Sequence, residues 1–170
     1  MPKAVSNSSP LIHLAAMERL KLLPTFYDDV LIPPAVWREV VEEGKGRPGA
    51  CEVDDAAKQG WLRIVAPTDG ALVRLLERDL HSGEAEAIAL AIEQTPDVIL
   101  VDETEARSAA GTFSLCVTGT IGLLMRAKQE GRITSLKVEM DRLRNEAGFW
   151  IDEGLYRRAL AAVGETTPGH

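Results

Sequence analysis

The stretch from residue 81 to residue 109 constrains the fold most, because it predicts four elements in succession: a helix, a tight reversal, a buried strand and a second helix. Ser82 or Gly83 begins the first helix, which consists mainly of small apolar residues. After a turn at Pro96, the β-branched run 98–101 is typical of a parallel strand covered on both faces. This unit indicates an α/β protein.

Two acidic residues occupy the ends of this unit. Glu84 lies in the first turn of the helix, and Asp102 directly follows the strand. A helix over 84–95 is about 18 Å long, and a strand over 97–102 spans roughly 17–20 Å. Because the two segments are antiparallel and similar in length, Glu84, Asp102 and the nearby Glu105 should converge at one edge of the sheet. Ligands bind at this carboxyl edge in open α/β sheets.

Helices and strands alternate along the rest of the chain. Strands are expected at 3–6, 30–32, 62–65, 98–101 and 115–117, and helices between them, the first one capped by Ser8 or Ser9 and begun by Pro10. Two amphipathic helices follow, at 135–146, with Leu136, Val138, Met140 and Leu143 on one side, and at 153–163, capped by Asp152. The order predicts a three-layer α/β/α, Rossmann-like fold around a central parallel sheet. We expect one domain, residues 1–163, and a flexible tail, residues 164–170.

Composition excludes several classes of protein. The net charge of −7 argues against a general nucleic-acid coat, although a nuclease whose carboxylates bind metal ions remains compatible with it. No apolar run approaches the roughly 18 residues that span a bilayer, and the N-terminal stretch does not resemble a secretory signal. Cys51 and Cys116 are isolated, which fits a reducing cytoplasm. Trp37, Trp61 and Trp150 are too far apart for a base-stacking row and are expected to pack in the core or at an interface.

Several oxygen-bearing side chains lie near the end of a predicted strand or in the helix that follows: Asn7, Glu39, Glu84, Asp102 and Glu105. A parallel sheet collects such positions at one edge, and clustered oxygens suit Mg²⁺ or Mn²⁺. Each residue also has a structural interpretation: Glu84 can favour a helix dipole, Asp102 can cap the next helix, and Glu39 can be a solvated surface residue.

The chain resembles PIN-domain proteins of the VapC-like ribonuclease type, and more narrowly a prokaryotic subgroup of them. The resemblance rests on five motifs in order: SNSSPLI, LIPPAVWREV, GEAEAIALA, ILVDETEAR and VTGTIGLLMRAKQEGRI. It extends from Ala4 to about Leu160. It implies a parallel sheet whose acidic metal site cuts single-stranded RNA with Mg²⁺ or Mn²⁺.

Position by position, the resemblance assigns the family's acids to this chain. The first falls on Asn7, the next on Glu39, the third on Glu84 and the fourth on Asp102, and Glu105 could add a further oxygen. The resemblance also implies that a hydroxyl near the first acid, Ser8 or Ser9, helps to shape the site.

The main departure from the family pattern is Asn7, where PIN nucleases usually carry Asp. A neutral amide oxygen can coordinate a cation but does not offset its charge, so metal affinity should be lower than with Asp. The narrower subgroup often carries Asn at this position.

Further groups could contact a substrate. Thr118 and Thr120 flank a turn whose amides could meet a phosphate, although an ordinary capped turn explains them too. Four cations, Arg107, Arg126, Lys128 and Arg132, could supply a positive surface for RNA or form a solvated helix face.

Two functions remain in competition. The first is a metal-dependent endoribonuclease, with the toxin half of a toxin–antitoxin pair as its cellular setting. It would act on single-stranded RNA, pair with an antitoxin protein and form a homodimer, as similar PIN proteins often do. The second is a non-catalytic module on the same fold that binds RNA or a protein partner. A phosphatase with an aspartyl nucleophile fits poorly, because Asn7-Ser8-Ser9 stands where it would need Asp-x-Asp.

Overall fold

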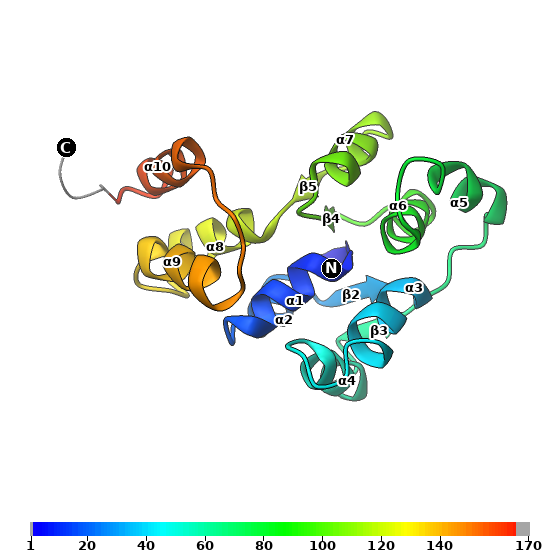
Figure 1. The fold of residues 1–170 in the computed structure, drawn as a ribbon, viewed down its shortest axis with the longest axis horizontal. Coiled ribbons are helices and arrows are strands. Elements are labelled where there is room, and N and C mark those ends of the chain that lie inside the picture. Colours follow the sequence, from blue (N-terminus) through cyan, green and yellow to red (C-terminus); the bar gives the residue numbers. More distant parts are fainter. Residues whose placement is uncertain (1, 166–170) are drawn as a thin grey trace.

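A five-stranded parallel sheet forms the centre of the molecule in the computed structural model, which describes residues 2–165 (Figure 1). The strand order is β3-β2-β1-β4-β5. Pairing is in register between Ala4 of β1 and both Val30 of β2 and Val98 of β4. The strands are β1 (Lys3–Ser6), β2 (Asp29–Ile32), β3 (Leu62–Ile64), β4 (Val98–Leu100) and β5 (Val117–Thr118).

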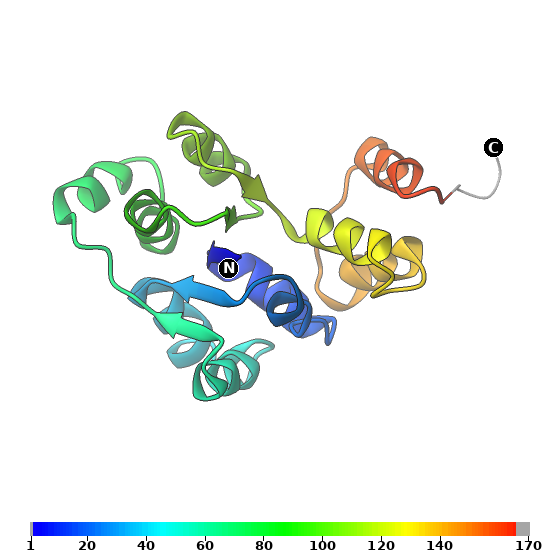
Figure 2. The same ribbon diagram turned by 180° about the vertical axis from the view of Figure 1, so that it is seen from behind.

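Helices cover both faces of the sheet, so the predicted three-layer α/β/α fold is confirmed (Figures 1 and 2). Successive residues of a strand point to opposite faces, and Ala4 and Val5 accordingly belong to two different hydrophobic clusters. One cluster packs α5 (Gly70–Leu76), α6 (Ser82–Gln94) and α7 (Thr104–Thr112). The opposite cluster packs α1 (Ser8–Ala16), α2 (Leu22–Phe26), α3 (Pro34–Trp37), η1 (Arg38–Glu42), α4 (Ala50–Gln59), α8 (Thr120–Gln129), α9 (Leu136–Glu146) and α10 (Glu153–Ala162).

The helix cap that the sequence predicts at Asp152 is confirmed, and Asp69 caps α5 in the same way. Asp69 and Asp152 accept hydrogen bonds from the backbone N–H groups of Leu72 and Leu155, at 3.0 and 3.1 Å. At α1 the expected serine cap is wrong. Asn7 holds the cap position there without a side-chain cap bond, because its amide group turns toward another partner.

Three local predictions need correction. The helix that begins at Pro34 widens into a π-helical turn, η1, instead of continuing as a regular α-helix. Strand β5 covers Val117–Thr118 instead of residues 115–117. On α9, Val138 is 55% exposed, whereas the other three residues predicted on its apolar side are fully buried. Trp150, which the sequence places in the core or at an interface, is 81% exposed and so lies outside the core.

The C-terminal segment packs back onto the fold as far as it is described. Glu165 accepts hydrogen bonds from the N–H groups of Leu136 and Lys137 at the start of α9, at 2.6 and 3.2 Å. The rest of the predicted tail, residues 166–170, lies outside the described residues. Among residues 2–165, no helix is both long and apolar enough to cross a membrane.

Candidate functional site

The strand order defines the place where a ligand would bind. The chain reverses its direction of progress across the sheet between β1 and β4, which lie side by side. In open α/β sheets the crevice outside the carboxyl ends of two such strands is the binding position. Asn7 directly follows β1, and Asp102 and Glu103 follow β4, so these three residues lie at the carboxyl edge of the two strands.

Asn7 is fully buried, and only one end of its side chain has a partner. Its Nδ2 donates to Glu103 Oε2 at 3.2 Å. Its Oδ1 accepts no hydrogen bond in the part of the chain that the structure describes. The backbone N–H of Asn7 donates to Leu100 O at 2.9 Å, which fixes the residue against β4. A buried acceptor without a donor is unusual in proteins and requires an explanation.

Gly83 separates the free oxygen of Asn7 from the carboxylate of Glu39. A Cβ placed on Gly83 would lie 3.5 Å from Asn7 Oδ1 and 3.2 Å from Glu39 Oε2. Glu39 itself is held by Ser8, whose hydroxyl donates to Oε2 at 2.8 Å. The absence of a side chain at residue 83 therefore keeps a small space open between two oxygens that come from distant parts of the sequence.

Glu84 lies at the beginning of α6 and is only 5% exposed. Its Oε1 lies 3.4 Å from the backbone N of His81 and 3.3 Å from His81 Nε2. Burial raises the pKa of Glu84 above its ordinary value; His81 opposes this rise, and the charges of Glu103 and Glu105 add to it. Negative charge on Glu84 is thus less favourable in the protein than in water.

Glu103 is a site residue that the sequence reasoning missed. Its carboxylate accepts hydrogen bonds from Asn7 Nδ2 and from the hydroxyl of Ser9. The charge of Glu103 also adds to the raised pKa of Glu84 at the start of α6. Adjacent residues of an extended segment point in opposite directions. The two consecutive acids after the strand, Asp102 and Glu103, could therefore have indicated that only one of them faces Asn7.

Asp102 faces away from Asn7 in its contacts. Its Oδ1 accepts the N–H of Thr120 at 2.7 Å, and its Oδ2 accepts the hydroxyl of Thr120 at 2.7 Å and lies 2.9 Å from His13 Nδ1. Thr120 is fully buried, so its two donors serve Asp102 instead of an external phosphate. Asp102 therefore ties α1, β4 and α8 together, and His13 is a second neighbour that the sequence reasoning did not single out.

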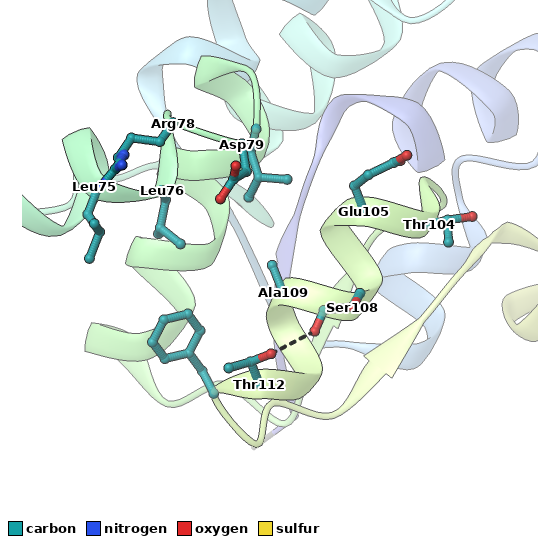
Figure 3. Close-up of a pocket in the computed structure, with 11 residues that line it drawn as sticks. Leu75, Leu76, Arg78, Asp79, Thr104, Glu105, Ser108, Ala109 and Thr112 are labelled. Carbon is teal, nitrogen blue, oxygen red and sulfur yellow. Dashed lines mark hydrogen bonds between the residues drawn. The ribbon is translucent and has the colours of Figure 1, made fainter.

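Glu105 lies on the first turn of α7, at the edge of a cavity of about 670 Å³ (Figure 3). Across this cavity lie Leu75 and Leu76 of α5, and Ser108 continues the wall along α7. Glu105 is exposed, yet its charge reaches Glu84. It thus lies at the periphery of the acidic edge. Thr118, at the end of β5, is half-buried and lines a different cavity beside Asp102.

The donor set fits a hard divalent cation by its chemistry. Asn7 supplies a buried and unpaired amide oxygen, and Glu39, Glu84 and Glu103 supply carboxylates from three other elements. Oxygen donors of this kind are the preferred ligands of Mg²⁺ and Mn²⁺. Within residues 2–165, no three His, Cys, Asp or Glu side chains are already grouped closely enough to hold a metal ion by themselves. The amide oxygen of Asn7 is therefore the feature that points to a cation here.

A comparison with protein families adds independent information. A family model described as a PIN domain matches residues 3–165 of the 170 residues. The match includes the whole sheet, the acidic edge and all helices up to α10. No curated protein matches the chain.

Proposed function

Because the chain belongs to the PIN-domain family, whose fold is of a nuclease type, we propose that it is an endoribonuclease that cuts single-stranded RNA with Mg²⁺ or Mn²⁺. The free Oδ1 of the buried Asn7 carries this proposal, because a bound cation would satisfy it. The acidic edge lies where the sheet topology favours ligand binding.

Each residue has a proposed task. Glu84, Glu39, Glu103 and Asn7 hold the cation, directly or through water, and Glu105 adds negative charge at the rim. Ser8 and Ser9 orient the carboxylates of Glu39 and Glu103. The cation, when bound, supplies polarisation of the scissile phosphate and a lowered pKa of water. Asp102 keeps the start of α8 in place beside the crevice, with Thr120 as its partner and Thr118 nearer to the substrate.

The test compares the wild-type chain with Glu84→Gln, Glu103→Gln and Asp102→Asn on a single-stranded RNA in Mn²⁺ and in chelator. Glu77→Gln, at the exposed residue that follows α5, is the matched control. We expect the wild type and the control to cut only in Mn²⁺, and Glu84→Gln and Glu103→Gln to lose activity. Equal cutting by all variants, or cutting in chelator, would contradict the proposed site.

A second candidate is a PIN-fold module that binds RNA or a protein without cutting. Asn7 favours it, since the amide lacks the charge that a carboxylate would bring to the cation. Calorimetric titration with Mn²⁺ separates the two functions. Heat of binding that disappears in Glu84→Gln supports the nuclease, and an absence of binding up to millimolar Mn²⁺ supports the module.

The cellular setting belongs to the same proposal: a cytoplasmic toxin that pairs with an antitoxin and forms a homodimer. Leu136, Met140 and Leu143 are fully buried in the core, so they do not supply the pairing surface. Exposed apolar side chains elsewhere, Val138 of α9 among them, are available instead. Sedimentation at micromolar concentration tests the dimer, and co-expression with the product of the neighbouring gene tests the antitoxin.

A further inference from the structure

A second cavity adjoins the acidic edge on the far side of Asp102. Its volume is about 460 Å³, within the range of about 300–1,000 Å³ that is usual for small-molecule sites. Its lining comes from α7, the β5–α8 connection, α8, the segment that joins α9 to α10, and α10. Asp102 lines it, and the next residue, Glu103, belongs to the proposed cation site. Consecutive Cα atoms are about 3.8 Å apart, so cavity and acidic edge are immediate neighbours.

The walls of this cavity divide into an apolar and a polar part. Phe149, Met125 and Leu155 provide apolar surface from three segments. Arg107 and the hydroxyl groups of Thr104 and Thr118 provide polar groups. A lining that combines an aromatic ring with a few hydrogen-bonding groups suits a nucleobase, which has an apolar face and a polar edge.

The aromatic wall is fixed in position. The ring of Phe149 packs edge-on against His13, with 4.7 Å between the ring centres. His13 in turn lies 2.9 Å from Asp102 Oδ2, which also accepts the hydroxyl of Thr120. A chain of contacts therefore connects the ring to the end of β4. Because the ring is already held in place, a base that stacks on it would cost little side-chain entropy.

Arg107 is the positive charge of the cavity. Its Nη1 donates to Val101 O at 3.2 Å, and it forms no ion pair among residues 2–165. By contrast, Arg126 is paired with Glu130, and Lys128 with Glu165. Asp102 lines the same cavity but forms no ion pair or hydrogen bond with Arg107, so the remaining N–H donors of the guanidinium are available to a phosphate group.

We propose that this cavity binds one unpaired nucleotide of the RNA strand next to the phosphodiester at the acidic edge, with its base on Phe149 and its phosphate at Arg107. This inference rests on the proposed function. Gly119 is part of the subsite, because a Cβ there would lie 2.8 Å from both Arg107 Nη1 and Asp102 Oδ1. Only glycine at residue 119 therefore allows the guanidinium to lie where it does.

The test measures the affinity for a short fluorescein-labelled oligouridylate by fluorescence anisotropy in Mg²⁺. The parent carries Glu84→Gln, so that the strand is not cut. Phe149→Ala and Phe149→Leu should each weaken binding about fivefold or more, the lower limit for loss of one stacked base, and Phe149→Trp should restore it. Phe149→Leu retains apolar packing if Phe149→Ala fails to fold. Phe113→Ala, at an exposed phenylalanine of a separate cavity, should change nothing.

A second variant tests the phosphate contact. Arg107→Met should lower affinity and reduce the slope of log K against log salt by about 0.7, the value for one phosphate contact on a single strand. Arg132→Met, at another exposed arginine, is its control. A mononucleotide that competes as well as the oligonucleotide would indicate a free-nucleotide site and overturn the proposal.

The outcomes separate the two proposals. If Phe149→Leu binds the strand as tightly as its parent, or cuts RNA with an unchanged KM in the active background, the nucleotide subsite is wrong and the nuclease proposal is unaffected. If the wild type neither binds nor cuts RNA, both are wrong.

Discussion

The side chain of Asn7 is bound to Glu103 through its amide nitrogen, while its amide oxygen remains without a donor in the described part of the chain. The bond is possible because asparagine carries a donor; a carboxylate at residue 7 would face Glu103 with an acceptor instead. The substitution of Asn for the usual Asp therefore relieves repulsion in the ion-free protein. The neutral amide, however, brings no negative charge to a bound cation.

Restoring the carboxylate should reverse this balance. In the absence of divalent ions, Asn7→Asp should lower the free energy of unfolding by about 1–3 kcal/mol, since it removes a buried hydrogen bond and adds a like charge. In Mn²⁺ the same variant should bind the ion more tightly than the wild type. Thermal unfolding with and without Mn²⁺ measures both effects. Asn145→Asp, at an exposed position, is the control; an equal response of the two variants would show that Asn7 lies outside the site.

Two neighbouring acids should respond differently to neutralisation. Glu103→Gln should abolish the stabilisation by Mn²⁺, because Glu103 faces Asn7 and Ser9. Asp102→Asn should retain it but lower stability by about 1.5–3 kcal/mol, the range for hydrogen bonds to a charged group, because Asp102 receives bonds from Thr120 and contacts His13. Melting curves over a Mn²⁺ series distinguish the two. The opposite pattern would make Asp102 the ligand, as the resemblance assigned it.

The sequence predicts the fold better than the site for a physical reason. Strands such as 98–101 have a continuous apolar pattern that only a sheet covered on both faces explains. The choice between Asp102 and Glu103, by contrast, depends on a one-residue alternation and on partners far along the chain: His13 lies 89 residues before Asp102. No local pattern encodes such a pairing.

The same limit applies to Glu84 and Asn7. The helix and the strand that follows it are antiparallel and similar in length, which predicts the start of α6 at the edge where β4 ends. The importance of Gly83 was not predictable, because a glycine at a helix start has many explanations. Its role follows only from the oxygens of Asn7 and Glu39 beside it.

Gly83→Ala should close the space between these two oxygens. The added Cβ would lie 3.2 Å from Glu39 Oε2 and 3.5 Å from Asn7 Oδ1. Alanine favours a helix over glycine by about 0.8–1.0 kcal/mol, so the variant should remain folded. Calorimetry should nevertheless detect at least tenfold weaker Mn²⁺ binding, a loss of about 1.4 kcal/mol. Gly111→Ala, in α7 where the space is open, controls for helix propensity; unchanged ion affinity in Gly83→Ala would contradict the proposed position of the cation.

Glu165 provides a test of pH dependence away from the site. Burial alone would raise its pKa, but the N–H groups of Leu136 and Lys137 outweigh this effect, and the pKa is lowered. Because the folded pKa lies below the unfolded value, the carboxylate stabilises the protein above about pH 4.3, and this stabilisation is lost as the pH falls through the folded pKa. At pH 7, Glu165→Gln should reduce stability by about 0.3–1 kcal/mol, the usual value for a charge at a helix N-terminus. The difference from wild type in urea unfolding should vanish at strongly acidic pH. A difference that persists or grows as the pH falls would show that the carboxylate of Glu165 does not stabilise the start of α9 through its charge.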